Sequence, residues 1–407
     1  MRTWIVCAAL ASTLAPRAAA AQMVSLTEAE ALAALGPDHP RVQAARAAVD
    51  IVRADVLAAS RWPNPRATFN REAVSGIAEH MLMVSQVLPV TGRRRLEVNA
   101  ATARTEASAS RADDRIRRVR ADLRLAFTDL WAAQEREREL ARSRERLNAL
   151  AGMLAMREEA GDAAGFDRLR AEREVFDVDA DRALAATDRA QAQAMLSTFL
   201  AAPVDAAVVE AVRSPVPAVP LPSVEALMAR AEASRGDLLA LAHDVDAAAF
   251  AERAAERLKV PEPELVAGTK TSNAAGGDVG SLVSVHVSIP LFDRGGPERA
   301  GAQARARQAR AEAVALRQMI RAQISAWRTA VIERRALAER HRDALGTGTD
   351  RIARIAQVSY DAGERGILEL LDAYRTASAV RLRQVELEAA VREAEIELEF
   401  VSGWEIP

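Results

Sequence analysis

The chain has 407 residues, half of them apolar, and a formal net charge of −2 at pH 7. This length is ample for a large core or for one long repetitive body. The near balance of charge gives no sign of nucleic-acid binding, and an aromatic content of only 4% favours long helices over a β-sandwich or an α/β sheet.

The first 21 residues have the pattern of a bacterial secretory signal peptide. Arg2 supplies the short charged region, residues 4–14 are apolar, and Ala19–Ala21 offers a small-residue cleavage site. Its removal takes away Cys7, the only cysteine, so the mature chain is expected to lack disulfides and thiol chemistry. Large residues before Cys7 argue against lipid attachment there. No later run reaches the roughly 20 apolar residues of a transmembrane helix, so we expect any membrane crossing to use strands.

Residues 22–202 form the first of two predicted structural repeats. A short helical pattern and a helix that starts at Pro40 lead to a pair of strands flanked by prolines. Apolar residues then recur in a heptad register, which predicts a long helix of about 100 Å at 1.5 Å per residue. A turn and a return helix follow. The predicted boundaries are 66–73 and 80–88 for the strands, about 93–157 for the long helix, 158–168 for the tip and about 166–200 for the return helix.

The long helix carries one dense run of charge, residues 134–146. Arginine and glutamate alternate there at helical spacings, and the run is interpreted as a solvated, salt-bridged face.

Residues 203–222 are predicted to be an extended, proline-rich linker between the halves. Residues 223–407 then repeat the first half, with strands at 264–272 and 281–289 and a tip at 360–372. The strand at 281–289 is the clearest in the chain, because apolar residues alternate with mostly polar ones along it.

The second tip matches the first. Gly363 and Gly366 interrupt two long helical patterns, and glycine favours a chain reversal there. Four residues of the first tip recur 202 positions later: Gly161, Leu169, Ala171 and Arg173 correspond to Gly363, Leu371, Ala373 and Arg375. A duplicated helical tip predicts a duplicated chain.

The predicted fold is mainly α-helical with a small β part. It consists of long antiparallel coiled-coil helices and four strands per protomer. Four strands cannot close a barrel alone, and open sheet edges are not tolerated in lipid. A homotrimer would supply twelve strands, within the known range of such barrels, and enough helices for a hollow tunnel.

With this pattern the chain resembles the TolC-like outer-membrane efflux proteins. The resemblance rests on the two halves, the proline-flanked strand pairs, the Ile-Pro-Leu-Phe-Asp-Arg-Gly-Gly run at 289–296 and the tip motif from Tyr360. The Leu-Phe-Asp-Arg-Gly-Gly-Pro part looks closest to members of the CzcC type that serve heavy-metal cation pumps. The strands depart from the family in carrying few aromatic residues, so the aromatic girdle is thin.

The resemblance implies a homotrimeric tube, with a barrel embedded in outer-membrane lipid and a helical tunnel in the periplasm. Its partners would be a periplasmic adaptor (membrane fusion) protein and an inner-membrane pump of the RND type. It also implies that Glu369 and Asp372 project into the narrowest part of the tunnel, where three copies form carboxylate rings that favour cations. Contacts of Tyr360 and Arg365 with Asp167 of the first repeat would hold the tip shut. The plainer interpretation is that acids after a turn are ordinary first-turn helix residues.

The sequence does not indicate an enzyme. It has no phosphate loop, nucleophile elbow, His-Glu-x-x-His or cysteine pair. The five histidines are scattered, with no two of them three or four positions apart, so we expect no metal site and no cofactor.

Three functions remain open from the sequence. The first is an outer-membrane exit duct of a tripartite efflux system for heavy-metal cations or drugs. The second is the outer-membrane channel of a type I polypeptide secretion system. The third is a periplasmic coiled-coil scaffold without a pore, against which the alternating strands and duplicated tips argue.

Overall fold

The computed structural model describes residues 24–161, 165–200, 208–213 and 219–404. The predicted signal peptide, with its cleavage site and Cys7, lies outside the described residues. Within them, no helix is both long enough and apolar enough to span a membrane.

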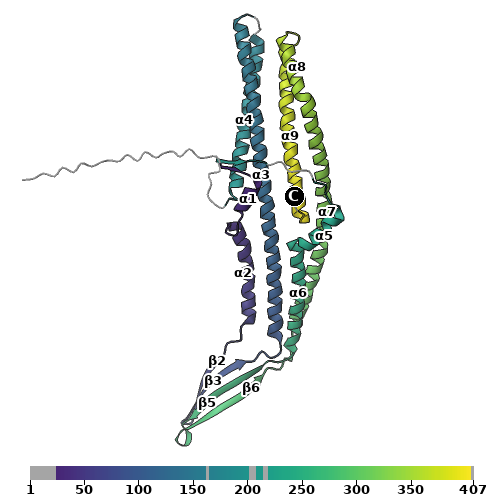
Figure 1. Ribbon diagram of the computed structural model, residues 1–407. Helices are drawn as coiled ribbons and strands as arrows, with labels where there is room; N and C mark the ends of the chain where they lie inside the picture. The colour runs from purple at the N-terminus through teal and green to yellow at the C-terminus, as the bar shows by residue number, and fades with distance from the viewer. Residues whose placement is uncertain (1–23, 162–164, 201–207, 214–218, 405–407) are drawn as a thin grey trace, which may run out of the picture.

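The helices form one elongated wall (Figure 1). Helix α3 runs nearly its whole length, and its 67 residues span about 100 Å. On one side of α3, helices α2 and α4 follow each other end to end, and on the other side α6 and α9 do the same. Helices α7 and α8 lie outside α6 and α9. The bounds are α2 Pro40–Ser60, α3 Arg93–Glu159, α4 Gly165–Ser197, α6 Gly236–Glu256, α7 Gly296–Ala344, α8 Asp350–Asp361 and α9 Ile367–Ser402.

The heptad seam packs this wall together. Leu123, Leu130 and Leu154 on α3 are fully buried, and Leu147 is 3% exposed. On α7, Ile320, Ile324 and Val331 are fully buried against α9 and the short helix α5 (Val224–Ser234). Many other seam positions are alanine, which lets neighbouring helices approach closely.

The four-stranded sheet at one end of the wall combines both repeats. Its order is β2-β3-β5-β6, and every neighbouring pair is antiparallel. The bounds are β2 Arg66–Val74, β3 Ile77–Val87, β5 Pro263–Ser272 and β6 Asp278–Val287. Strands β2 and β6 are the edges, and each has a free side within the described chain.

The register gathers large apolar residues on one face of this sheet, which also carries Arg71 and His80, and leaves the other face more polar. Phe69 lies opposite Leu82, and Val84 opposite Ala267, which in turn lies opposite Val283. Side chains alternate between faces along a strand, so these residues share one side. The other side carries Glu79 and Lys270, which form an ion pair at 2.6 Å, together with Glu72, Ser284 and His286.

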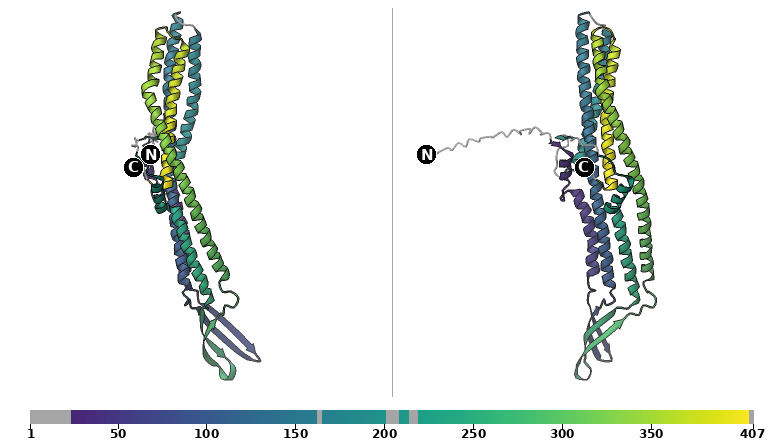
Figure 2. Two further views of the ribbon diagram at one scale, coloured as in Figure 1. Left: turned by 90° about the vertical axis from the view of Figure 1, so that its right-hand side faces the viewer. Right: turned by 45° about the vertical axis from the view of Figure 1, so that its right-hand side comes forward.

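A second, small sheet lies at the middle of the wall and was not expected from the sequence. Strand β1 (Val24–Leu26) pairs in parallel with β4 (Val209–Ala211), which falls within the predicted linker. Buried Gln134 accepts a hydrogen bond from the Ala211 amide at 3.2 Å. Helix α1 (Glu28–Ala34) follows β1, and a capping box formed by Thr27 and Glu30 caps its N-terminus. In the edge-on view of Figure 2, these middle elements and α5 lie on one side of the wall.

The helical pattern of the second repeat is broken where the sequence predicted continuity. A π-helical turn, Leu345–Thr349, separates α7 from α8. The first repeat has no such break, because α3 is continuous to Glu159. Two short 3-10 turns complete the described elements, η2 at Arg257–Lys259 and η3 at Ala274–Gly276.

Candidate functional site: the paired helical tips

Two helical hairpins end side by side, opposite the sheet (Figure 1). Helix α3 turns into α4 at the first tip, and α8 turns into α9 at the second. Gly161 and Gly363 end the incoming helices with φ of +81° and +73°. Each N–H donates back to a carbonyl three residues earlier, Glu158 or Tyr360, at 3.0 Å. Glycine adopts this left-handed conformation without strain, so the two tips end their incoming helices with the same glycine C-cap.

Gly366, the third predicted tip glycine, has a different backbone conformation from Gly161 and Gly363. Its φ of −84° is open to any residue, and it stands at the N-cap of α9 without a side-chain cap. A Cβ atom at this position would lie 3.2 Å from the Glu369 carboxylate. Glu369 therefore folds back toward the helix start, where negative charge is favourable.

An apolar cluster holds the two hairpins together just below the tips. Leu150 and Leu154 of α3 pack with Leu370 and Leu371 of α9, and Tyr360 of α8 is only 8% exposed in the same cluster. Of the four duplicated tip positions, Ala171 and Ala373 are both buried here. Leu371 is buried too, whereas its counterpart Leu169 is 58% exposed.

The structure brings two of the three predicted gate residues together. The half-buried Asp167 lies close enough to Tyr360 to affect its ionisation. Burial raises the pKa of the Tyr360 hydroxyl, and the negative charge of Asp167 adds to that rise. Arg365 is exposed, and within the described part of the chain its side chain forms no hydrogen bond or ion pair with either residue.

The arginine that lies near Tyr360 is Arg157, not the predicted Arg365. Its guanidinium lies 5.7 Å from the centre of the Tyr360 ring. It also lies 3.6 Å from the carboxylate of Asp361, so it links α3 to α8 within one chain. No sequence pattern connected this residue to Tyr360, although Arg157 is the last basic residue before the first tip.

The predicted ring residues, Glu369 and Asp372, are exposed on α9. They lie three positions apart and therefore near each other on the helix surface. Among the described residues neither carboxylate has an ion-pair partner, so their charge is available to whatever faces this side of α9.

Two ion-pair groups connect the repeats below the tips. Arg375 on α9 binds both oxygens of Glu174 on α4, with its Nε at 2.6 Å, and this hydrogen bonding raises the pKa of the guanidinium. Its duplicated counterpart, Arg173, instead pairs along its own helix with Asp177 at 2.7 Å. The repeats have thus diverged, since only the second arginine crosses between them.

Glu139 is the centre of the second group. Its side chain is 4% exposed and lies 3.1 Å from Arg146, 3.1 Å from Arg381 and 3.6 Å from Arg142. This corrects the interpretation of residues 134–146 as a solvated face, because at least one glutamate of the run is buried. Burial is possible because three guanidinium groups surround this carboxylate.

The residues that the structure describes contain no cluster of three or more His, Cys, Asp or Glu side chains that could hold a metal ion. The tips offer exposed carboxylates, an apolar cluster and ion pairs.

The family model described as outer membrane efflux protein matches residues 227–403. No curated protein matches the chain. Among solved structures, the chain is similar to the outer-membrane channel OprN, with a TM-score of 0.75, 19% identity and coverage of 92% of this chain and 89% of that chain.

Two further structures have the same fold. CusC, studied for its folding and transmembrane channel formation, gives a TM-score of 0.76 at 16% identity and covers 93% of this chain and 92% of that chain. The open state of the MtrE outer-membrane channel of Neisseria gonorrhoeae gives 0.74 at 17%, with 93% and 89% covered. The likeness confirms the predicted fold of a single chain, long antiparallel helices with a small four-stranded sheet. It does not single out the heavy-metal members, so that closer assignment stays a prediction.

Proposed function

We propose that the chain is a TolC-like outer-membrane efflux protein and the passive exit duct of a tripartite efflux system, because the model of the outer membrane efflux protein family matches residues 227–403. Three copies form a tube that lies in the outer membrane and extends into the periplasm. The duct transports its cargo and does not catalyse a reaction. This fits the similar proteins, which are channels.

The observation that carries this proposal is the open, two-faced sheet. Its strands have 9, 11, 10 and 10 residues, the length of a tilted strand that crosses a bilayer. One face is mainly apolar, as lipid contact requires, and the other is mainly polar, as a water-filled lumen requires. Edges β2 and β6 each need a partner strand in lipid. Three copies of this 4-stranded sheet give 3 × 4 = 12 strands and leave no edge.

The helical wall supports the same assembly. Its outer edges are α4 on one side and α7 with α8 on the other. On α4, Phe176 is 66% and Leu184 is 65% exposed. On α8, Ile352 is 55% and Val358 is 67% exposed. Large apolar side chains at both edges suit contact between neighbouring copies, which turns three flat walls into a closed tunnel.

The tips then form the periplasmic aperture. In this proposal Glu369 and Asp372 of three copies line it as carboxylate rings, which attract cations and hinder anions. Tyr360 and Asp167, with Arg157 between α3 and α8, hold the two hairpins of one copy together. Arg365 is exposed, so its gate contact with Asp167 is assigned to a neighbouring copy.

A periplasmic adaptor protein and an inner-membrane pump of the RND type are the proposed partners, and heavy-metal cations or drugs are the proposed cargo. The acidic rings favour cationic cargo over folded or anionic cargo. A deletion strain tests this directly. It should accumulate cationic drugs or heavy-metal cations, and expression of the wild-type chain should restore efflux. A strain that exports these cations normally and instead retains a secreted polypeptide would contradict the efflux assignment.

A further inference from the structure

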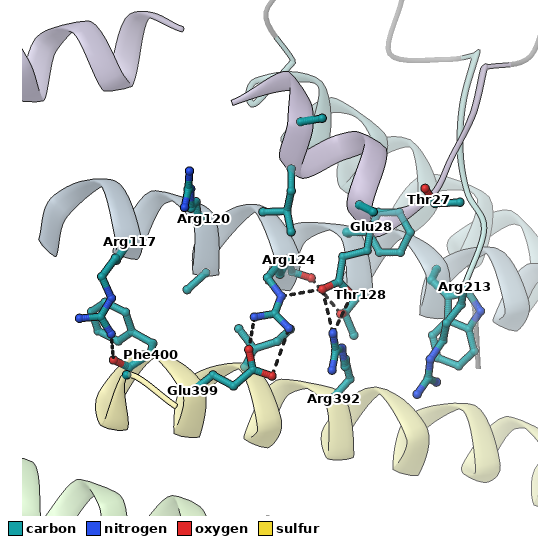
Figure 3. A pocket seen from close by; sticks show the side chains of 18 residues that line it. Thr27, Glu28, Arg117, Arg120, Arg124, Thr128, Arg213, Arg392, Glu399 and Phe400 are labelled. Atoms are coloured by element: carbon teal, nitrogen blue, oxygen red, sulfur yellow. Dashed lines mark hydrogen bonds and ion pairs between the residues drawn. The ribbon is translucent and has the colours of Figure 1, made fainter. Parts of the chain in front are cut away.

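A cavity of about 790 Å³ lies far from the tips, where α1 crosses the groove between α3 and α9 (Figure 3). Its apolar lining includes Leu32 from α1, Phe127 and Trp131 from α3, and Phe400 from α9. We call this cavity the equatorial groove. Its volume is within the range of known ligand sites.

The two acidic residues of the groove are already neutralised. Glu28 accepts hydrogen bonds from Arg124 at 2.5 Å and from Arg392 at 2.8 Å. Glu399 accepts from the same Arg124 at 3.2 Å. Burial tends to raise the pKa of Glu28, but Arg392 and Arg124 outweigh it and lower the pKa, so this carboxylate stays charged.

The arginines of the groove are unequally compensated. Five arginines line it against two glutamates, and Arg117, Arg213 and Arg392 also pair with acids just outside the lining: Asp114, Glu388 and Glu395. Arg120 is exposed and has no ion-pair or hydrogen-bond partner among the described residues. Arg213 lies 3.4 Å from Glu388, which lies outside the lining, and burial still lowers the pKa of Arg213. Additional negative charge in the groove would compensate both arginines.

The two under-compensated arginines lie at opposite ends of the groove. Arg213 stacks 4.7 Å from the centre of the Trp131 ring, and Trp131 follows Arg120 by 11 residues on α3. At 1.5 Å per residue the ends are about 16 Å apart. One phosphate group cannot contact both, whereas an extended peptide of about five residues spans this distance at 3.3 Å per residue.

The location excludes the membrane as the source of that charge. Arg117, at the near end of the groove, follows the start of α3 beside the sheet by 24 residues, which is about 36 Å of helix. A lipid headgroup at the sheet does not reach this far. If the proposed trimer forms through the outer helices α4, α7 and α8, the groove also stays open, because α3 and α9 lie in the middle of the wall.

We propose that the equatorial groove binds an extended acidic segment of a partner protein, with carboxylates four to six positions apart at Arg120 and Arg213 and apolar side chains between them. This site is separate from the aperture and does not depend on the gate. The charge pairs at both ends fix the register of the segment along the groove, and the apolar lining holds the side chains between them.

A peptide array tests the proposal with the full-length protein in mild detergent. Nine-residue peptides carry two aspartates at spacings from two to seven, with leucine or serine between them, and each has a matched peptide with asparagines. We expect binding to peak at spacings of four to six and to disappear with asparagine. In solution, Arg120→Gln and Arg213→Gln should each raise the Kd of the best peptide about five- to tenfold. The control is Arg305→Gln, an exposed arginine on α7 outside the groove.

Three results would overturn the proposal. The first is an array without any aspartate-dependent spot. The second is equal binding by wild type and the double variant Arg120→Gln with Arg213→Gln. The third is displacement of the peptide by the same concentration of inorganic phosphate, which would show that the groove holds only a small anion. Native mass and cation conductance of both variants should stay at wild-type values, and this separates a failed peptide site from a failed duct.

Discussion

Arg381 of α9 donates a hydrogen bond at 3.1 Å to Glu139 of α3, two residues that are 242 positions apart in the chain. The Glu139 side chain is 4% exposed, so the bond lies inside the wall. It ties the second repeat to the first below the aperture. Arg142 and Arg146 also contact Glu139, but they belong to α3 and cannot hold α9.

Loss of Arg381 should loosen the second hairpin. In Arg381→Gln the buried Glu139 keeps only contacts within α3, and a charge-assisted hydrogen bond of this kind contributes about 1.5–3 kcal/mol. Amide hydrogen exchange in α8 and the start of α9 should become about tenfold faster or more, since each 1.4 kcal/mol is a factor of ten. Arg383→Gln is the matched control, because Arg383 pairs along its own helix with Glu386 at 2.8 Å. Equal exchange in both variants would show that the Glu139 contact is dispensable.

The gate predictions separate contacts within a copy from contacts between copies. Arg157→Ala removes the link from α3 to Tyr360 and Asp361, so the resting conductance in planar bilayers should rise severalfold. The double change Asp167→Ala with Arg365→Ala should raise it as well, because it removes the proposed contact between neighbours. Arg354→Ala, which changes an exposed arginine on α8, is the control. Wild-type conductance in both test variants would mean that these residues do not hold the tip shut.

The carboxylate rings should control ion preference more than conductance. Replacing Glu369 and Asp372 by Ala removes six negative charges from a trimeric aperture, two from each of three copies. Cation selectivity and block by multivalent cations should both weaken, and the difference from wild type should shrink at high salt as the charges are screened. The control, Asp38→Ala, changes an exposed acid far from the tips. Unchanged reversal potentials in the ring variant would leave these acids as ordinary helix-start residues.

The two faces of the sheet should respond differently to charge. Val283 lies on the apolar face, and a lysine there costs about 2–4 kcal/mol at the bilayer midplane. We therefore expect Val283→Lys to abolish trimers in the outer membrane. The neighbouring Ser284→Lys places the same charge on the polar face, so trimers should form and cation conductance should fall. Normal assembly of Val283→Lys would contradict the assignment of the apolar face to lipid.

The strands were predictable from alternation, but their ends were not. Strand β2 ends within one residue of the expected position. Strand β3 begins at Ile77 instead of 80, because Ser75 and Gly76 adopt positive φ and close a two-residue turn that extends the pairing. Strand β6 ends at Val287 and not at 289, where its partner β5 begins with Pro263. The three-residue strands β1 and β4 are too short to carry any pattern.

The tip was partly predictable for a related reason. Glycine and heptad spacing are local, so the positions of Gly161, Gly363 and the turn after Tyr360 could be read from the chain. Ion pairing is not local. No sequence pattern connects Arg157 to Tyr360, and only the packing of the two hairpins places its guanidinium 5.7 Å from the centre of the Tyr360 ring. In the same way, the burial of Glu139 depends on Arg381, which no spacing rule connects to it.

Native mass spectrometry of the protein purified from outer membranes in mild detergent, with the same sample then added to a planar bilayer, tests the central claim most directly. The account predicts a mass of three mature chains that resists dissociation, and discrete, cation-selective conductance steps from that species. A monomer that inserts no pore would contradict it, because a single four-stranded sheet with two open edges cannot line a channel in lipid.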